Sequence, residues 1–165
     1  MRFSFVDRIT SLEPGQSVTA VKALSRAEEY LADHFPGFPV MPGVLMLEAL
    51  IQAGAWLMRY TEDFQYSVIM LKQARSLRFN NFVAPGQTLA VTATVHERSE
   101  REWVFKGNGA IDGVSAFSAR IALEQFNLRE NNPDFIKSDQ VRIEEFRRIF
   151  AEVWTPQADG QAPRG

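Results

Sequence analysis

The sequence contains no cysteine among its 165 residues and only two histidines, His34 and His96. The lack of cysteine excludes disulfide bonds, thiolate nucleophiles and cysteine-based zinc sites. No group of histidines and carboxylates has metal-ligand spacing, and no glycine-rich loop resembles a phosphate cradle. The sequence therefore predicts neither a metal centre nor a nucleotide-binding loop.

Long apolar runs and an excess of charge of one sign are also missing. The net charge of −2 gives no basic field, so neither nucleic acid nor an anionic membrane is indicated as a partner. Runs such as Val44–Leu47 fall far short of the roughly 20 apolar residues of a membrane span. The first ten residues lack the apolar core of a secretory signal. We expect a cytoplasmic protein.

Hydrophobic periodicity predicts an α+β protein with strands at both ends of a long helix. The expected elements are strands at 3–12 and 16–24, a short helix at 26–35, a long helix at 43–60, strands at 67–79, 88–97, 102–111 and 114–126, and an amphipathic helix at 138–153. We assign residues 1–130 to one domain. Residues 131–165 form an extension with the amphipathic helix and a flexible tail.

The helix predicted at 43–60 is apolar on every face, and its first half carries a single carboxylate, Glu48. A helix that is apolar all round is buried. One antiparallel sheet wrapped around it is the simplest way to bury it, but it also needs cover beyond a single sheet. A homodimer partner can supply that cover.

The stretch HFPGFPVMPGVLMLEAL, from His34 to Leu50, contains groups suited to acid–base chemistry. A carboxyl group in apolar surroundings tends to keep its proton, so Glu48 can act as a general acid. Neutral His34 can act as a base. The N–H groups of Gly43 and Val44, at the helix N-terminus, can hold an oxyanion. These parts suit removal of a proton next to a carbonyl and loss of a β-hydroxyl.

Each of these residues also has a purely structural interpretation. His34 can be a hydrogen-bonded loop residue, and Glu48 can face the one wet side of the helix. Gln52, one turn further on, can hydrogen-bond Glu48. Periodicity does not bring His34 and Glu48 together within one chain. We interpret His96, at a strand end, as a surface residue.

Three segments resemble the β-hydroxyacyl-acyl carrier protein dehydratases of bacterial fatty-acid synthesis, which are hot-dog-fold enzymes. HFPGFPVMPGVLMLEALIQAGAW is the most specific, and LRFNNFVAPGQTLAV and EWVFKGNGAIDGVSAFSARIAL agree with it. The resemblance covers about residues 3–124. It implies a long central helix wrapped by an antiparallel sheet and a dimer whose sheets join edge to edge.

The resemblance also implies the roles of individual residues. His34 of one subunit is the base and meets Glu48 of the other subunit, which helps the hydroxyl leave. The N–H of Gly43 polarises the thioester carbonyl, and the acyl tunnel lies at the dimer interface. The further residues expected at the substrate are Val44, Phe38 and Gln52. The family usually has a second histidine where this chain has Phe38.

The function implied is dehydration of a (3R)-hydroxyacyl-acyl carrier protein to the trans-2-enoyl form, without a cofactor. The expected partners are the acyl carrier protein and a second copy of the chain, with a trimer of dimers as a further option. A hot-dog thioesterase and a non-catalytic carrier-binding or lipid-binding protein remain as alternatives. The residues we consider for carrier docking are Lys72, Arg75, Arg78, Arg98 and Arg101.

The C-terminal amphipathic helix lies outside the resemblance. Its apolar stripe is expected to dock on the protein's own sheet or at an oligomer contact. The stripe consists of Ile143, Phe146, Ile149, Phe150 and Val153.

Overall fold

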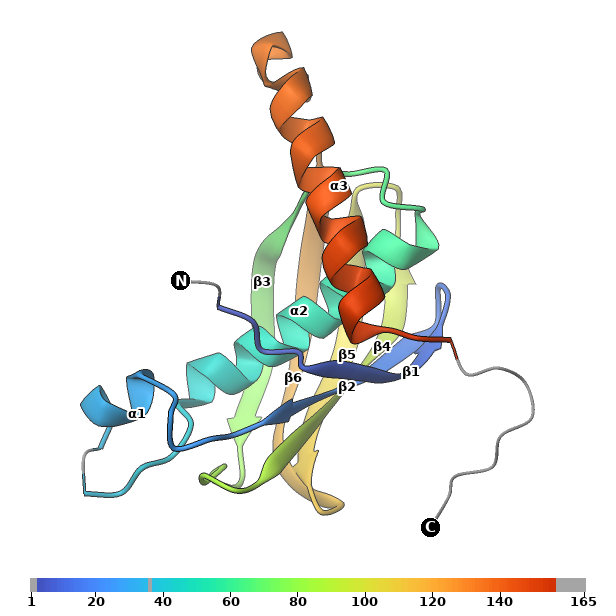
Figure 1. The fold of residues 1–165 in the computed structure, drawn as a ribbon. Helices are drawn as coiled ribbons and strands as arrows, with labels where there is room; N and C mark the ends of the chain where they lie inside the picture. Colours follow the sequence, from blue (N-terminus) through green and yellow to red (C-terminus); the bar gives the residue numbers. More distant parts are fainter. Residues whose placement is uncertain (1–2, 36, 157–165) are drawn as a thin grey trace.

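A computed structural model describes residues 3–35 and 37–156 of the chain (Figure 1). Its helices are α1 (Tyr30–Asp33), α2 (Gly43–Thr61) and α3 (Ile136–Val153), with short 3₁₀ turns η1 (Leu128–Glu130) and η2 (Pro133–Phe135). Its strands are β1 (Arg8–Glu13), β2 (Ser17–Ala23), β3 (Val68–Phe79), β4 (Thr88–Arg98), β5 (Glu102–Ile111) and β6 (Val114–Phe126). The strands form one antiparallel sheet in the order β1-β2-β4-β5-β6-β3.

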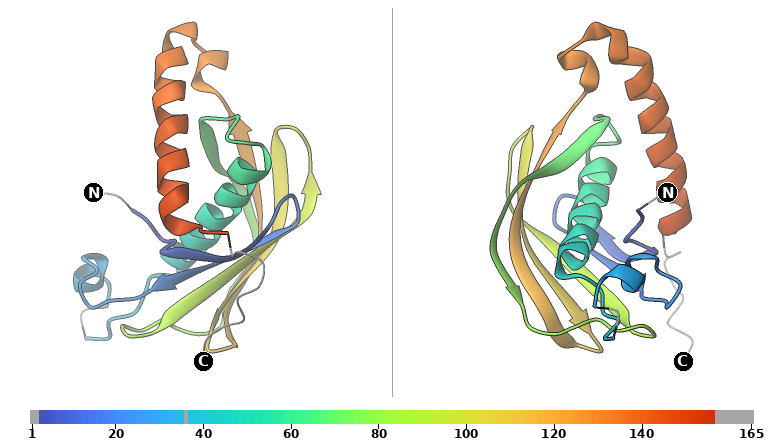
Figure 2. Two further views of the ribbon diagram at one scale, coloured as in Figure 1. Left: turned by 45° about the vertical axis from the view of Figure 1, so that its right-hand side comes forward. Right: turned by 90° about the vertical axis from the view of Figure 1, so that its left-hand side faces the viewer.

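The sheet curves around α2, as both views in Figure 2 show. Alternation along β4 turns Leu89, Val91 and Ala93 inward, and all three are fully buried. The helix packs tightly on the sheet at Gly107 of β5, where an added Cβ would lie 2.3 Å from the Cδ2 atom of Leu50. The predicted α+β architecture, a sheet wrapped around a long central helix, is confirmed.

Most predicted elements occur close to their expected limits, but two are shorter. The first strand begins at Arg8 instead of residue 3, because the Phe5 N–H bonds to the Gln52 side chain of α2 and the ladder with β2 starts only at Arg8. The short helix shrinks to Tyr30–Asp33, and the last helix begins two residues early, at Ile136. The expected flexible tail lies largely outside the described residues, and the domain boundary at residue 130 stays a prediction.

Helix α3 lies across α2, on the side away from the sheet (Figure 2). Phe150 is buried and stacks on the Tyr60 ring at 5.2 Å, while Phe146 meets Trp56 edge-on at 5.9 Å. The apolar stripe therefore docks within its own chain, but mainly on α2 and not on the sheet, where it was expected. Its main aromatic partners belong to α2 and not to the sheet, because α2 presents apolar side chains that the sheet does not reach.

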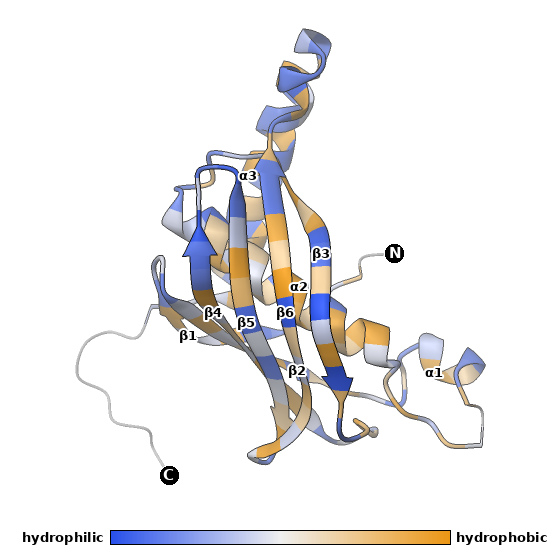
Figure 3. Cartoon of the chain, turned by 180° about the vertical axis from the view of Figure 1, so that it is seen from behind, coloured by the Kyte–Doolittle hydropathy of each residue, from blue (hydrophilic) through white to orange (hydrophobic). Residues whose placement is uncertain are grey.

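The outer face of the sheet and one of its edges are open (Figure 3). Strand β3 pairs only with β6, so its other edge carries unpaired backbone groups, and Met70 and Phe79 are nearly half exposed along it. Within residues 3–35 and 37–156, neither α2 nor any other helix combines the length and hydropathy of a membrane span.

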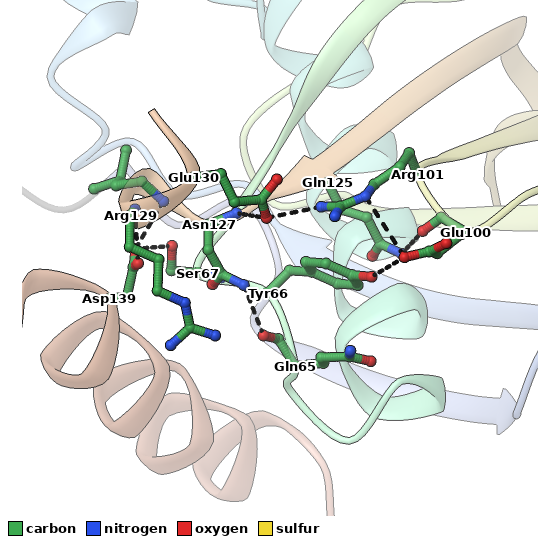
Figure 4. Close-up of polar contacts among 11 residues, drawn as sticks. Gln65, Tyr66, Ser67, Glu100, Arg101, Gln125, Asn127, Arg129, Glu130 and Asp139 are labelled. Atoms are coloured by element: carbon green, nitrogen blue, oxygen red, sulfur yellow. Dashed lines mark hydrogen bonds and ion pairs between the residues drawn. The ribbon is translucent and has the colours of Figure 1, made fainter. Parts of the chain in front are cut away.

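A buried carboxylate, Asp139, anchors the N-terminal half of α3 (Figure 4). Its oxygens accept hydrogen bonds from the Ser67 hydroxyl, from the Leu128 N–H at 2.9 Å and from the Arg129 N–H at 3.0 Å. Burial by itself would raise the pKa of Asp139, but these three donors outweigh it and hold the pKa below its ordinary value. The charged form is thus part of the fold.

Asp139→Asn tests this anchor, because the amide keeps the size of the side chain but loses the charge and one acceptor. We expect the free energy of unfolding at neutral pH to fall by about 2 kcal/mol. A carboxylate with a lowered folded pKa stabilises above its unfolded pKa. The advantage of wild type should therefore shrink as the pH falls below 3.8. Urea titrations across pH measure this, with exposed Asp134→Asn as control; equal stability of wild type and Asp139→Asn at every pH would contradict it.

Candidate active site

The N-terminus of α2 offers backbone donors. Helix α2 begins at Gly43 after Pro42, whose carbonyl accepts from the N–H groups of Leu45 and Met46. Among the described residues, no acceptor bonds the N–H of Gly43 or of Val44. An added Cβ at Gly43 would lie 2.8 Å from the Cζ atom of Phe79, so only glycine fits without displacing that ring. Free N–H groups at a helix N-terminus favour an oxyanion.

His34 lies beside these donors, in the turn that ends α1. Its N–H donates to the Tyr30 carbonyl at 3.1 Å, and its half-buried ring contacts Phe35, 4.4 Å away between centroids. Phe35 has a φ of 49°, a left-handed conformation that forces a sharp turn. His34, Gly43 and Val44 line one pocket of about 380 Å³.

Phe38 joins the His34 loop to the segment after β3. Its ring meets Phe82 edge-on, with centroids 5.5 Å apart and planes at 89°. Both rings are more than half exposed, and Phe82 lines the pocket that holds His34. This aromatic contact positions the loop by packing.

Glu48 lies one turn into α2 and lines a different pocket, of about 470 Å³, between α2 and α3. The amide of Gln52 donates to the Glu48 carboxylate at 2.9 Å and to the Phe3 carbonyl at 3.0 Å. The Gln52 oxygen accepts from the Phe5 N–H at 2.9 Å. The hydrogen bond between Gln52 and Glu48 that the sequence suggested is therefore present, and the same amide also fixes the N-terminal segment.

The single chain does not bring His34 and Glu48 into one pocket. It does bring His34 together with Gly43 and Val44, and Glu48 with Gln52. The Glu48 pocket contains further residues that the sequence did not single out for the site: Phe3, Ser4, Arg59, Phe146 and Ile149. The positions of Glu48, Gln52 and Arg59 on one helix face were the only available signal for Arg59.

The remaining sequence candidates lie on the surface. His96 is exposed beside Glu97, as expected, and no group of three metal-ligating side chains occurs in the described part of the chain. Lys72 pairs with Glu102 and Arg101 with Glu130. The basic side chains of the docking set that join no ion pair among the described residues are Arg75, Arg78 and Arg98.

The chain is similar to known proteins over most of its length. A family model described as FabA-like domain matches residues 1–120. A 3-hydroxyacyl-acyl-carrier-protein dehydratase FabZ of Magnetococcus marinus is 37% identical over 72% of this chain and 79% of its own length. A protein of the same name from Thiobacillus denitrificans is 36% identical over 72% of this chain and 84% of its own length.

Solved structures share the fold at low identity. A chain of the dehydratase heterocomplex ApeI:P from Xenorhabdus doucetiae superposes with a TM-score of 0.66 at 18% identity, covering 81% of this chain and 90% of that one. The E. coli PaaI protein from the phenylacetic acid degradation operon superposes with a TM-score of 0.55 at 12% identity. The match covers 71% of this chain and 81% of that one. The sheet wrapped around α2 is thus the hot-dog fold.

The family model covers most of the chain, so this hot-dog protein is a FabA-like domain. With this match and these relatives, the chain belongs to the FabZ family of 3-hydroxyacyl-acyl-carrier-protein dehydratases. Helix α3 lies beyond the part that the family model matches.

Gln52→Leu tests how the N-terminal segment is attached near Glu48. Leucine removes the acceptor of the buried Phe5 N–H, so we expect its amide hydrogen to exchange about tenfold faster. The Ala23 N–H, which donates to Asp7 at 2.7 Å, serves as an internal reference. Hydrogen exchange followed by NMR measures both; an unchanged Phe5 rate would contradict the tether.

Proposed function

We propose that this chain dehydrates a (3R)-hydroxyacyl group on acyl carrier protein to the trans-2-enoyl group, as the names of its FabZ relatives describe. The observation that carries the proposal is the pocket shared by His34 and the free N–H groups of Gly43 and Val44. A base next to an oxyanion site is what removal of a proton beside a thioester carbonyl requires.

Each of these residues has one role in the reaction. The N–H groups of Gly43 and Val44 bind the thioester oxygen and stabilise the negative charge that develops on it. His34 takes the proton from Cα. The electron pair of that C–H bond forms the double bond as the Cβ–O bond breaks, and Glu48 donates a proton to the hydroxyl, which leaves as water. The thioester already acidifies Cα, so the reaction needs no cofactor.

A homodimer completes this site in our proposal, with His34 of one subunit facing Glu48 of the other. Two observations support it: the pair lines separate pockets in the single chain, and β3 leaves an open edge for a second sheet. The acyl carrier protein would meet Arg75 and Arg78 on β3, which join no ion pair with any residue that the structure describes. A cytoplasmic location belongs to the same proposal, whereas a trimer of dimers adds nothing that the site needs.

His34→Ala and Glu48→Gln each remove one proton-transfer group. We expect each to lower turnover of a 3-hydroxyacyl-carrier-protein substrate by about a hundredfold or more, with an unchanged circular dichroism spectrum. Enoyl absorbance measures dehydration, while thiol release measures the thioesterase alternative. Near-normal dehydration by either variant rules out its assigned role.

Mixing the two inactive variants tests whether the site is shared. A dimer of one His34→Ala and one Glu48→Gln subunit keeps one intact pair, so unfolding and refolding an equal mixture should restore about a quarter of wild-type activity. Each variant refolded alone is the control. No recovery, with mixed dimers verified by mass spectrometry, places the pair within one subunit.

A further inference from the structure

A buried cation, Lys22 of β2, links the sheet to the segment that carries His34. Lys22 is 7% exposed, and its ammonium nitrogen lies 2.9 Å from the Glu28 carboxylate and 3.4 Å from that of Asp7. Burial by itself would lower the pKa of Lys22, but the two carboxylates outweigh it and raise the pKa above its ordinary value. The lysine is therefore charged at neutral pH, although the proposed proton transfers make no use of it.

The two carboxylates that Lys22 joins belong to different parts of the fold. Asp7 is fixed to the sheet, because its Oδ2 atom accepts a hydrogen bond from the Ala23 N–H, at the end of β2, at 2.7 Å. Glu28 lies just before α1, and its carbonyl accepts from the Leu31 N–H of that helix at 3.1 Å. The lysine thus ties α1 to the sheet through one carboxylate on each side.

The segment of residues 25–40, which contains α1, has few other polar links to the rest of the fold. Backbone hydrogen bonds attach the chain at its two ends, at Leu24 and at Met41, to the loop of residues 83–87. Among the described residues, the ion pair with Lys22 is the only other polar contact between this segment and the remainder of the chain. Apolar packing supplies the rest of the attachment and is non-directional, so the ion pair provides the directional contact.

Helix α1 transmits the position of Glu28 to His34. The helix is a single turn at one end of the fold and has no side-chain cap, so it is not stable without tertiary contacts (Figure 1). The His34 N–H donates to the Tyr30 carbonyl at 3.1 Å and closes this turn at its C-terminal end. A shift of α1 therefore carries His34 with it, relative to Gly43 and Val44, which belong to α2.

We propose that Lys22 is a positioning residue for the dehydration: by binding Glu28 it fixes α1 relative to the sheet, and α1 in turn places His34 beside the N–H groups of α2. Without the lysine, the half-buried Glu28 carboxylate loses its counter-charge and is repelled by that of Asp7, so it moves toward water and takes α1 with it. A displacement of about 1 Å can cost about a hundredfold in rate. This role rests on the proposed function, which makes His34 the base.

Steady-state kinetics with 3-hydroxydecanoyl-carrier protein tests this role in the full-length protein. We expect Lys22→Met and Glu28→Gln each to lower kcat about tenfold with KM nearly unchanged, because the base moves while the groups that bind the thioester stay in place. The double variant should be no slower than Lys22→Met, since both changes remove the same contact. Glu28→Gln is the milder change and keeps the test open if Lys22→Met does not fold.

Amide hydrogen exchange followed by NMR reports the attachment of the segment without turnover. The His34 N–H should exchange about tenfold faster in both single variants, because the turn of α1 opens more often once its ion pair is lost. The Met41 N–H, which donates to the Val83 carbonyl at 2.8 Å just beyond the segment, should keep its rate and serves as the internal reference.

Arg147→Met is the matched control, because it also removes a cation from an ion pair, with Asp63 at 3.0 Å, at the opposite end of α2 from Gly43. It should keep the wild-type kcat and the wild-type His34 exchange rate. Wild-type kcat or unchanged His34 exchange in the Lys22 and Glu28 variants, an additive loss in the double variant, or an equal loss in Arg147→Met overturns the proposal. A wild-type protein that fails to dehydrate the substrate rejects the proposed function instead, while the exchange rates still decide whether Lys22 holds the segment.

Discussion

The structure depends on one constraint: α2 is apolar on nearly every face and must be covered on more than one side. The curved sheet covers one side, and α3 covers the C-terminal half of the other. Neither covers Val44 in the first turn, which is 68% exposed beside N–H groups that no described acceptor bonds. The chemistry that we propose thus lies where the cover of the helix stops, which is also where substrate and a second subunit can approach.

The sequence predicted the elements whose causes are local. Alternating apolar residues and turn residues determine the limits of β4, β5 and β6, and Pro42 determines where α2 starts. The predicted start of β1 was wrong because the Phe5 N–H bonds to the Gln52 side chain, 47 residues away. No local sequence pattern reports such a contact. The apolar stripe on α3 predicted that this face is covered. It did not predict which element covers it, because an apolar helix face packs equally well on a sheet and on a helix.

The candidate site could likewise be predicted only in part. The motif between His34 and Glu48 identified both residues, while their separation into two pockets required the three-dimensional structure. Arg59 was missed because a basic residue in the last turn of a helix is ordinary and complements the helix dipole. Its burial results from Phe146, which follows it only after four intervening strands.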